Sequence, residues 1–266
     1  MKKNIVRTYE WAKKTLNFQI GCENGCLYCY AREMATRYSW KNAKDWTNVR
    51  IREKELNRNF SNFDEIVMFP SSHDITPNNI NQTILFLRKI LEAGNQVLIV
   101  SKPNYDCIKI ICKEFVQYKD KIFFRFTIGS TSDEVLKFCE PNAHSFKERF
   151  KSLKHVFKKG FQTSISCEPM LDNNIEKVIK KIDPFVTDTI WLGKANRLLG
   201  KTGRGRLEFN GVLTDKTKQK AEELIVWQND ENLIALYGQL KKNKKIRWKE
   251  SIKDVLKKYK IIWNKE

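Results

Sequence analysis

Short apolar segments alternate with segments of helical spacing over the first 192 residues of this chain. The apolar segments have the length of strands and are rich in β-branched and aromatic residues. Six strand–helix units in series predict a parallel sheet covered by helices, either a partial barrel or an open doubly wound sheet. In both folds, ligands bind where the strands end. The predicted strands are residues 16–20, 65–69, 96–100, 122–128, 161–167 and 189–192, and the predicted helices are 30–38, 79–93, 105–118, 132–138, 145–159 and 174–181.

This pattern stops after residue 192. A loop with Gly and Arg at 200–206 leads into two amphipathic segments, 215–228 and 231–242, which predict helices. We therefore expect two parts, a barrel over residues 1–199 and a basic helical extension over residues 200–266.

The last stretch, residues 241–266, holds eleven Lys or Arg against three acidic residues. It also contains Trp248, Tyr259 and Trp263. Aromatic side chains among basic ones can stack on nucleic-acid bases. They can equally belong to a helical lid that packs on the barrel, and the sequence leaves both interpretations open.

The formal net charge of +19 favours a polyanionic partner, because Lys and Arg release condensed counterions when they bind phosphates. A genome rich in A and T would also raise the Lys content, and Lys makes up 37 of the 50 basic residues. The chain has no apolar run of about 18 residues and no signal-peptide pattern at its start. We therefore expect a cytoplasmic protein without a membrane span. The oligomeric state is not indicated.

Seven cysteines, an odd number, argue against a disulfide framework and for free thiols or a metal site. Cys22, Cys26 and Cys29 lie within eight residues, directly after the first predicted strand. Three thiolates can each bind one iron of a cubane cluster, which leaves the fourth iron without a protein ligand. A zinc site would need a fourth ligand, and the three histidines lie far along the chain.

The C-x3-C-x2-C spacing, with Tyr28 before the last cysteine, resembles the signature of the radical S-adenosylmethionine superfamily. The resemblance implies a partial (β/α)6 barrel of the radical SAM type and a [4Fe-4S] cluster on Cys22, Cys26 and Cys29. It also implies that S-adenosylmethionine chelates the open iron and is cleaved by one electron to methionine and a 5′-deoxyadenosyl radical. That electron would come from a reductant such as flavodoxin or ferredoxin.

The string QIGCENGCLYCYARE and the stretch from TIGSTSDEV to SCEPML are similar to the spore photoproduct lyase group. The resemblance covers roughly residues 16–193. It implies that Tyr28 lies against the adenine of S-adenosylmethionine. Further cofactor-binding candidates follow predicted strands or lie on the next helices: Ser72, Asp74, Ser101, Lys102, Ser130, Glu140, Arg149 and Glu168.

Several of these candidates have specific expected partners. Asp74 would receive the methionine amino group, and Lys102 would bind the methionine carboxylate or a substrate phosphate. Glu140 and Arg149 would form a polar pair that either orders the site or is purely structural. Lyases of this group return a hydrogen atom from a thiol, and Cys167 or Cys139 could do so, with a buried structural cysteine as the alternative.

The resemblance and the charge together predict a radical SAM enzyme that acts on a nucleic acid, by repair of a DNA lesion or by modification of a base. One alternative is the same radical chemistry on a small molecule or a peptide. Another is a non-enzymatic iron–sulfur module that binds nucleic acid.

Overall fold

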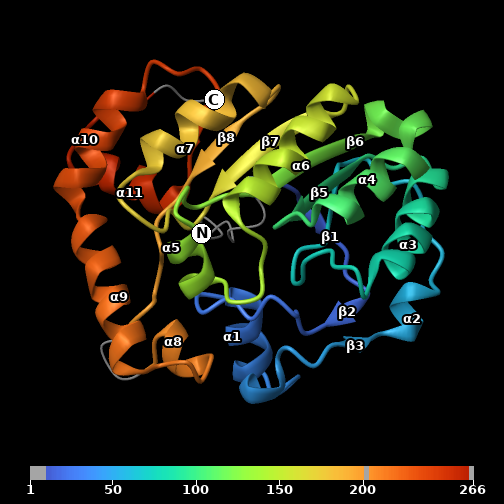
Figure 1. Cartoon of the computed structure of the whole chain (residues 1–266), viewed down its shortest axis with the longest axis horizontal. Coiled ribbons are helices and arrows are strands. Elements are labelled where there is room, and N and C mark those ends of the chain that lie inside the picture. The colour runs from blue at the N-terminus through green and yellow to red at the C-terminus, as the bar shows by residue number, and fades with distance from the viewer. Residues whose placement is uncertain (1–9, 201–203, 264–266) are drawn as a thin grey trace.

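The structure, a computed structural model, describes residues 10–200 and 204–263. Within these ranges, seven parallel strands form one sheet that curls into a half-barrel (Figure 1). This architecture confirms the predicted partial barrel. The strands, in the order in which they pair, are β1 (Lys14–Thr15), β4 (Val67–Phe69), β5 (Val97–Ser101), β6 (Ile122–Thr127), β7 (Gln162–Cys167), β8 (Ile190–Leu192) and β9 (Ile246–Trp248).

Helices connect the strands and cover the sheet, and α6 contacts both β6 and β7. Within the described ranges, each helix is too short or too polar to cross a bilayer. Figure 1 shows α9 and α10 along one side of the molecule and α3 on the opposite side. The α-helices are α1 (Tyr30–Arg37), α2 (Glu53–Leu56), α3 (Ile80–Glu92), α4 (Tyr105–Glu114), α5 (Asp133–Cys139), α6 (Phe146–Lys158), α7 (Ile175–Ile182), α8 (Arg206–Phe209), α9 (Asp215–Trp227), α10 (Asp230–Leu240) and α11 (Glu250–Lys258).

Local sequence signals explain where the barrel helices begin. The side chain of Asn104 accepts a hydrogen bond of 2.9 Å from the backbone N–H of Cys107 and so caps α4. Ser145 caps α6 in the same way, through the backbone N–H of Glu148 at 3.3 Å. Such caps satisfy backbone donors that have no partner inside the helix. The predicted starts of these two helices are therefore confirmed, whereas α4 ends at Glu114, before the predicted end at residue 118.

The first predicted strand, residues 16–20, is wrong in its position. The strand of the main sheet is β1, which ends before Leu16, whereas Gln19–Ile20 forms β2. This β2 pairs antiparallel with β3 (Arg50–Ile51) in a separate two-stranded ribbon. Leu16 and Phe18 are buried, so the apolar run marks a segment of the core. Apolar character alone does not specify which strand a segment will join.

The C-terminal part of the chain also departs from expectation. The helices expected at 215–228 and 231–242 are present as α9 and α10, but the basic stretch after them contains a strand that was not predicted. This β9 pairs parallel with β8 and becomes the seventh strand of the barrel. Residues 201–203 and 264–266 of the predicted extension lie outside the described residues.

The two tryptophans of this stretch pack on the protein. Trp248 lies in β9, is 6% exposed, and contacts Tyr237 with ring centroids 5.3 Å apart. Trp263 is partly buried against the same hydrophobic core. The structure therefore supports the lid-like interpretation of these two side chains rather than base stacking, while Tyr259 is 48% exposed.

Candidate cofactor site

The loop that carries the three cysteines runs from β2 to α1 and depends on glycine for its shape. Gly21 has a φ of +96°, and a Cβ there would lie 2.7 Å from the backbone oxygen of Trp46. Only glycine adopts this conformation without strain and without a collision. The backbone N–H of Cys22 then donates to the same oxygen at 3.1 Å. At the far end, the sulfur of Cys29 caps α1 by accepting from the backbone N–H of Arg32 at 3.4 Å.

All three thiols are free, with Cys22 and Cys26 buried and Cys29 half-buried. Burial raises the pKa of each of the three thiols, and the negative charge of Asp74 raises the pKa of Cys22 further. The protein alone therefore keeps these sulfurs protonated. A metal ion can replace the proton, because a coordinated thiol is deprotonated outright. Three free soft donors in one short loop fit an iron–sulfur cluster.

Asp74 gathers the predicted residues next to Cys22. Its carboxylate accepts hydrogen bonds from the backbone N–H of Lys102 at 2.7 Å, the Ser101 hydroxyl at 3.1 Å and the Asn24 amide at 2.8 Å. The Lys102 ammonium lies 3.3 Å from Asp74 Oδ2, and the Cys22 sulfur lies 3.7 Å from that oxygen. Asn24 was not predicted, although it lies inside the cysteine motif.

The charges of Asp74 and Lys102 stabilise each other. Burial alone would raise the pKa of Asp74, but the Lys102 charge and the hydrogen bonds hold it below its usual value. Burial alone would lower the pKa of Lys102, but the charge of Asp74 raises it well above the ordinary value. Both groups are therefore ionised at neutral pH, and a pair of opposite charges lies beside the cysteine loop.

A second buried chain of hydrogen bonds holds Tyr28. Its hydroxyl donates to one carboxylate oxygen of Glu140, and the guanidinium of Arg149 donates to the other. Arg149 also donates to the backbone oxygens of His144 at 2.8 Å and Thr127 at 3.2 Å. Glu140 and Arg149 are completely buried. The two side chains therefore form the predicted pair, and Glu140 also holds the hydroxyl of Tyr28.

The structure does not bring Ser72 and Ser130 to this group of side chains. Ser72 is bound through its backbone N–H to the side chain of Asn17 at 3.0 Å. Ser130 is fully buried, and its hydroxyl donates to Asp172. In the structure both positions hold loops together.

Glu168 and Cys167 make contacts outside the Asp74 group. A Glu168 carboxylate oxygen lies 3.4 Å from the ammonium of Lys249. Cys167 is completely buried in the hydrophobic core, and burial raises the pKa of its thiol. Cys139 lies next to the cysteine loop. Its backbone oxygen accepts a hydrogen bond of 2.9 Å from the backbone N–H of Leu27 in that loop.

The C-terminal extension reaches back to the cysteine loop through two residues that the sequence did not single out for this role. The Asn210 amide donates to the backbone oxygens of Leu27 at 2.8 Å and Cys29 at 3.1 Å. The Arg206 guanidinium donates to the backbone oxygen of Tyr28 at 3.2 Å. These bonds satisfy three consecutive carbonyls of the loop and hold it in one conformation.

Glu33 joins the same region through three arginines. Its carboxylate lies 2.7 Å from Arg37, 2.7 Å from Arg197 and 3.0 Å from Arg206. Only 4% of the Glu33 side chain is exposed. Helix α1 is therefore tied to the segment that follows β8 and to α8.

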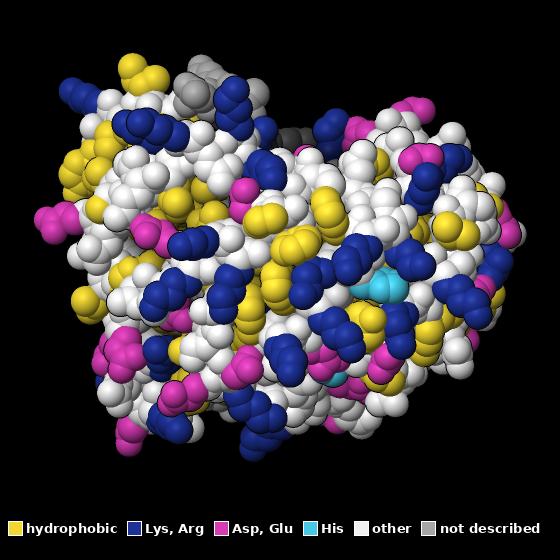
Figure 2. Space-filling view, turned by 45° about the horizontal axis from the view of Figure 1, so that its top comes forward, with side chains coloured by type: hydrophobic (Ala, Val, Ile, Leu, Met, Phe, Trp, Pro, Cys, Tyr) yellow, Lys and Arg dark blue, Asp and Glu magenta, His cyan; other side chains and the backbone are white. Residues whose placement is uncertain are grey.

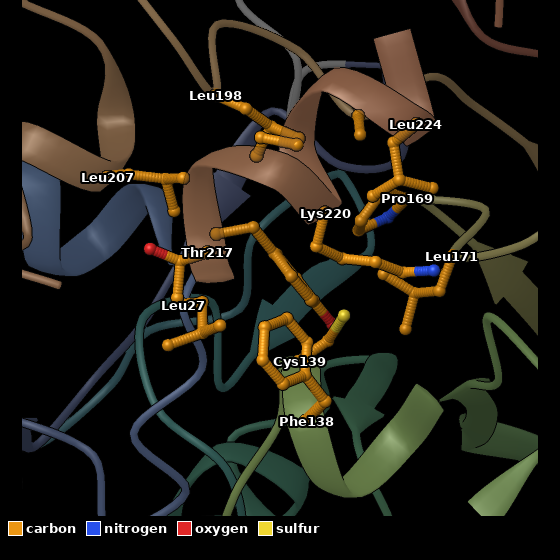
Figure 3. A pocket seen from close by; sticks show the side chains of 13 residues that line it. Leu27, Phe138, Cys139, Pro169, Leu171, Leu198, Leu207, Thr217, Lys220 and Leu224 are labelled. Atoms are coloured by element: carbon orange, nitrogen blue, oxygen red, sulfur yellow. The ribbon is translucent and has the colours of Figure 1, made fainter. Parts of the chain in front are cut away.

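A largely apolar pocket opens beside Tyr28, between the cysteine loop, α5 and α9 (Figure 3). In Figure 3 Lys220 extends from α9 with its ammonium end toward Leu171. The lining residues are Leu27, Tyr28, Phe138, Cys139, Pro169, Leu171, Ala195, Leu198, Leu207, Thr217, Lys220, Ala221 and Leu224.

Solved structures of spore photoproduct lyase share this fold. Spore photoproduct lyase complexed with dinucleoside spore photoproduct superposes with a TM-score of 0.55 at 13% identity, over 93% of this chain and 80% of that one. A cysteine-to-alanine mutant of the same enzyme gives a TM-score of 0.51 at 13% identity, over 89% and 76% of the two chains.

Two relatives are similar in sequence. An uncharacterized protein of Acidianus two-tailed virus is 21% identical over 232 residues, which cover 78% of this chain and 73% of the viral protein. An uncharacterized protein of Methanocaldococcus jannaschii is 25% identical over 181 residues, which cover 65% and 67% of the two proteins.

The family model of the Radical SAM superfamily matches residues 16–183, which include the cysteine loop and the barrel strands from β4 to β7. Members of this superfamily are enzymes that use a [4Fe-4S] cluster and S-adenosylmethionine. The match covers more than half of the chain, and the chain therefore belongs to the radical SAM superfamily.

Proposed function

We propose that Cys22, Cys26 and Cys29 hold the [4Fe-4S] cluster of this radical SAM enzyme. The free thiols in one glycine-shaped loop support the assignment. Reductive cleavage of S-adenosylmethionine to methionine and a 5′-deoxyadenosyl radical is the chemistry that the cluster supplies when bound. The electron would come from flavodoxin or ferredoxin.

The Asp74–Lys102 pair is the observation that carries the cofactor assignment. The methionine end of S-adenosylmethionine is a zwitterion, with an ammonium and a carboxylate close together. Asp74 would accept hydrogen bonds from the methionine amino group, and the Lys102 ammonium would bind the carboxylate. The pair lies next to the Cys22 sulfur, as this role requires.

Tyr28 would lie against the adenine. Its hydroxyl is held by Glu140, so the ring is fixed before the cofactor arrives. A ring that is already ordered loses little further entropy when it binds a ligand. The apolar pocket beside Tyr28 would shield this end of the site from water.

Nucleic acid is the substrate class that we propose, with repair of a lesion or modification of a base as the reaction. The net charge of +19 supports it, and Figure 2 shows Lys and Arg side chains spread over one face of the molecule. The fold is also similar to that of an enzyme whose solved structure holds a dinucleoside photoproduct.

Anaerobic reconstitution with iron and sulfide tests the cofactor assignment. The wild-type protein should acquire the broad charge-transfer absorption of the cluster, and with dithionite it should convert S-adenosylmethionine to 5′-deoxyadenosine. Replacement of Cys22, Cys26 or Cys29 with Ala should abolish both signals. Cys107→Ala and Cys112→Ala are matched controls, since both are buried free thiols on α4. Full cluster occupancy in a Cys26→Ala protein would contradict the ligand set.

A further inference from the structure

The inner face of the half-barrel carries polar and charged side chains. Phe124 and Phe126 of β6 belong to the hydrophobic core, so Arg125 between them points to the opposite face of the sheet. Its guanidinium donates to the Ser164 hydroxyl of β7 at 2.8 Å and to the Thr189 hydroxyl at 3.3 Å. A barrel interior filled only for stability is dominated by branched apolar residues. This one instead holds a buried cation.

A second buried cation, Lys249, follows β9 at the same end of the sheet where Glu168 follows β7. Lys249 is 1% exposed. Its ammonium lies 3.0 Å from Glu10 Oε1 and 3.4 Å from Glu168 Oε2. The unpredicted strand β9 is what places this lysine inside the barrel.

Trp11 lies between the two cations. The Lys249 ammonium is 4.4 Å from the centre of its ring, and the Arg125 guanidinium carbon is 5.0 Å from it. The ring of Trp191, on β8, lies 6.1 Å from that of Trp11. The segment that begins at Glu10 therefore enters the barrel and lies against the inner faces of β6, β8 and the start of α11.

Several buried polar atoms in this region have no hydrogen-bond partner among residues 10–200 and 204–263. They are Glu10 Oε2, Trp11 Nε1, one terminal nitrogen of Arg125 and the Ser166 hydroxyl. Arg125 is only 6% exposed, and Ser166 is the neighbour of Trp191 in the sheet register. Buried donors normally find an acceptor, and an unpaired one destabilises the fold. Arg125 also lies 3.7 Å from the Asp188 carboxylate, so the unused N–H groups of Arg125 and Trp11 are suited to an oxyanion that takes the place of Glu10.

We propose that Lys249 and Arg125 form a subsite for an oxyanion of the substrate, and that the Glu10 carboxylate occupies this subsite in the structure. This inference rests on the proposed nucleic-acid substrate, whose phosphodiester is the oxyanion in question. The phosphodiester replaces the Glu10 carboxylate on Lys249, so one negative charge is exchanged for another. The unused N–H groups of Arg125 and Trp11 then gain acceptors.

The exchange explains why a buried lysine is paired with a carboxylate from the beginning of the chain. A buried charge is tolerated when it is paired, so an anion that takes the place of Glu10 leaves Lys249 paired. Glu168, on the strand end, keeps Lys249 in place while Glu10 leaves.

Isothermal titration calorimetry on the reconstituted protein, at saturating S-adenosylmethionine, tests the subsite. The probe is the dinucleoside monophosphate TpT, compared with its methylphosphonate analogue, in which the linkage is uncharged. Wild-type protein should bind TpT at least about tenfold more tightly than the analogue, because only the charged linkage gains the two cations. Equal affinities for the two probes would overturn the proposal.

Single substitutions test whether the preference for TpT depends on Lys249 and Glu10. Glu10→Gln removes the competing anion and should tighten TpT binding about tenfold, whereas Lys249→Met should weaken it at least about tenfold. Lys249→Arg keeps the charge and should keep most of the affinity, so a folding failure of Lys249→Met leaves the test intact. Glu250→Gln and Lys257→Met, an exposed ion pair on α11, are the matched controls and should change nothing. An unchanged affinity in Glu10→Gln would overturn the proposal.

Two further measurements separate this subsite from other sources of oxyanion binding. Inorganic phosphate that binds as tightly as TpT would assign the site to free phosphate and overturn its role for the substrate. Displacement of TpT by S-adenosylmethionine would assign the site to the cofactor, with the same consequence. Cleavage of S-adenosylmethionine by the wild type is measured separately. Its absence would count against the proposed function and not against the subsite.

Discussion

Glu140 is a buried carboxylate whose two oxygens both accept hydrogen bonds, one from Tyr28 and one from Arg149. Replacing Arg149 with Met leaves this charge unpaired in the core, and the free energy of unfolding should fall by about 3–5 kcal/mol. The double variant Glu140→Gln with Arg149→Met removes both charges and should recover a large part of that loss. Urea denaturation measures both values. A double variant no more stable than Arg149→Met alone would contradict the paired-charge explanation.

His73 is a residue whose protonation should affect stability. It is buried against the rings of Phe18 and Phe69, at centroid distances of 5.1 and 6.0 Å. Burial lowers its pKa from 6.5 to about 4, so the folded protein holds the imidazole neutral while the unfolded chain protonates more readily.

The free energy of unfolding should therefore fall as the pH falls from about 6.5 to about 4, with a contribution from His73 of about 3 kcal/mol. Denaturant unfolding of the iron-free protein at several pH values in this window measures the effect. His73→Asn lacks the titrating group, and its stability should depend less on pH. Identical pH dependences would show that His73 does not contribute.

At the scale of elements, α8 matters because it binds the cysteine loop. Arg206 and Asn210, at its start and just after its end, donate to three backbone oxygens of the loop. Groups that hydrogen-bond to metal ligands, without contacting the metal, typically contribute 10- to 100-fold to metal affinity. The extension that the sequence presents as a basic surface thus has a structural role at the site.

Asn210→Ala and Arg206→Met should each speed the release of iron to a chelator about tenfold, because the loop loses bonds that hold its cysteines in place. The decay of cluster absorption after addition of the chelator gives the rate. Arg204→Met is the matched control, since Arg204 is an exposed arginine two residues before Arg206. Equal rates for all four proteins would show that α8 does not support the cluster.

At the scale of the whole molecule, the net charge of +19 makes a prediction about salt. If nucleic acid is the partner, the logarithm of its affinity should fall linearly with the logarithm of salt concentration. A footprint of about six phosphates corresponds to a loss of roughly a thousandfold between about 50 and 200 mM salt. Filter binding over this range measures the slope. A slope near zero would favour a small-molecule or peptide substrate, and Lys enrichment would then reflect composition.

The two parts of the chain are joined more closely than their different sequence patterns indicate. The extension supplies β9 to the sheet, Lys249 to the barrel interior and Arg206 to the cysteine loop. The boundary between a barrel part and an extension at residues 199 and 200 stays a prediction. The strand β9 belongs to the barrel sheet, although its residues lie in the predicted extension.

The resemblance of the cysteine loop to the radical S-adenosylmethionine signature implied the cofactors. The sequence by itself determined the strand–helix alternation and the cysteine loop. These features are local, because the period of apolar residues reports the burial of one face, and three thiols within eight residues must lie close together. The sequence also allowed Asp74, Ser101 and Lys102 to be predicted as site residues, because the strand ends of a parallel sheet share one edge.

Only the tertiary structure decided which of those strand ends meet. Asp74 joins Lys102 beside Cys22, whereas Ser130 bonds Asp172 and Cys167 is buried in the core. The pairing of β9 with β8 carries Lys249 into the barrel to meet Glu10, a residue at the other end of the chain. Such contacts depend on sheet register and on how a curved sheet closes, and a short apolar run contains no information about its distant partner.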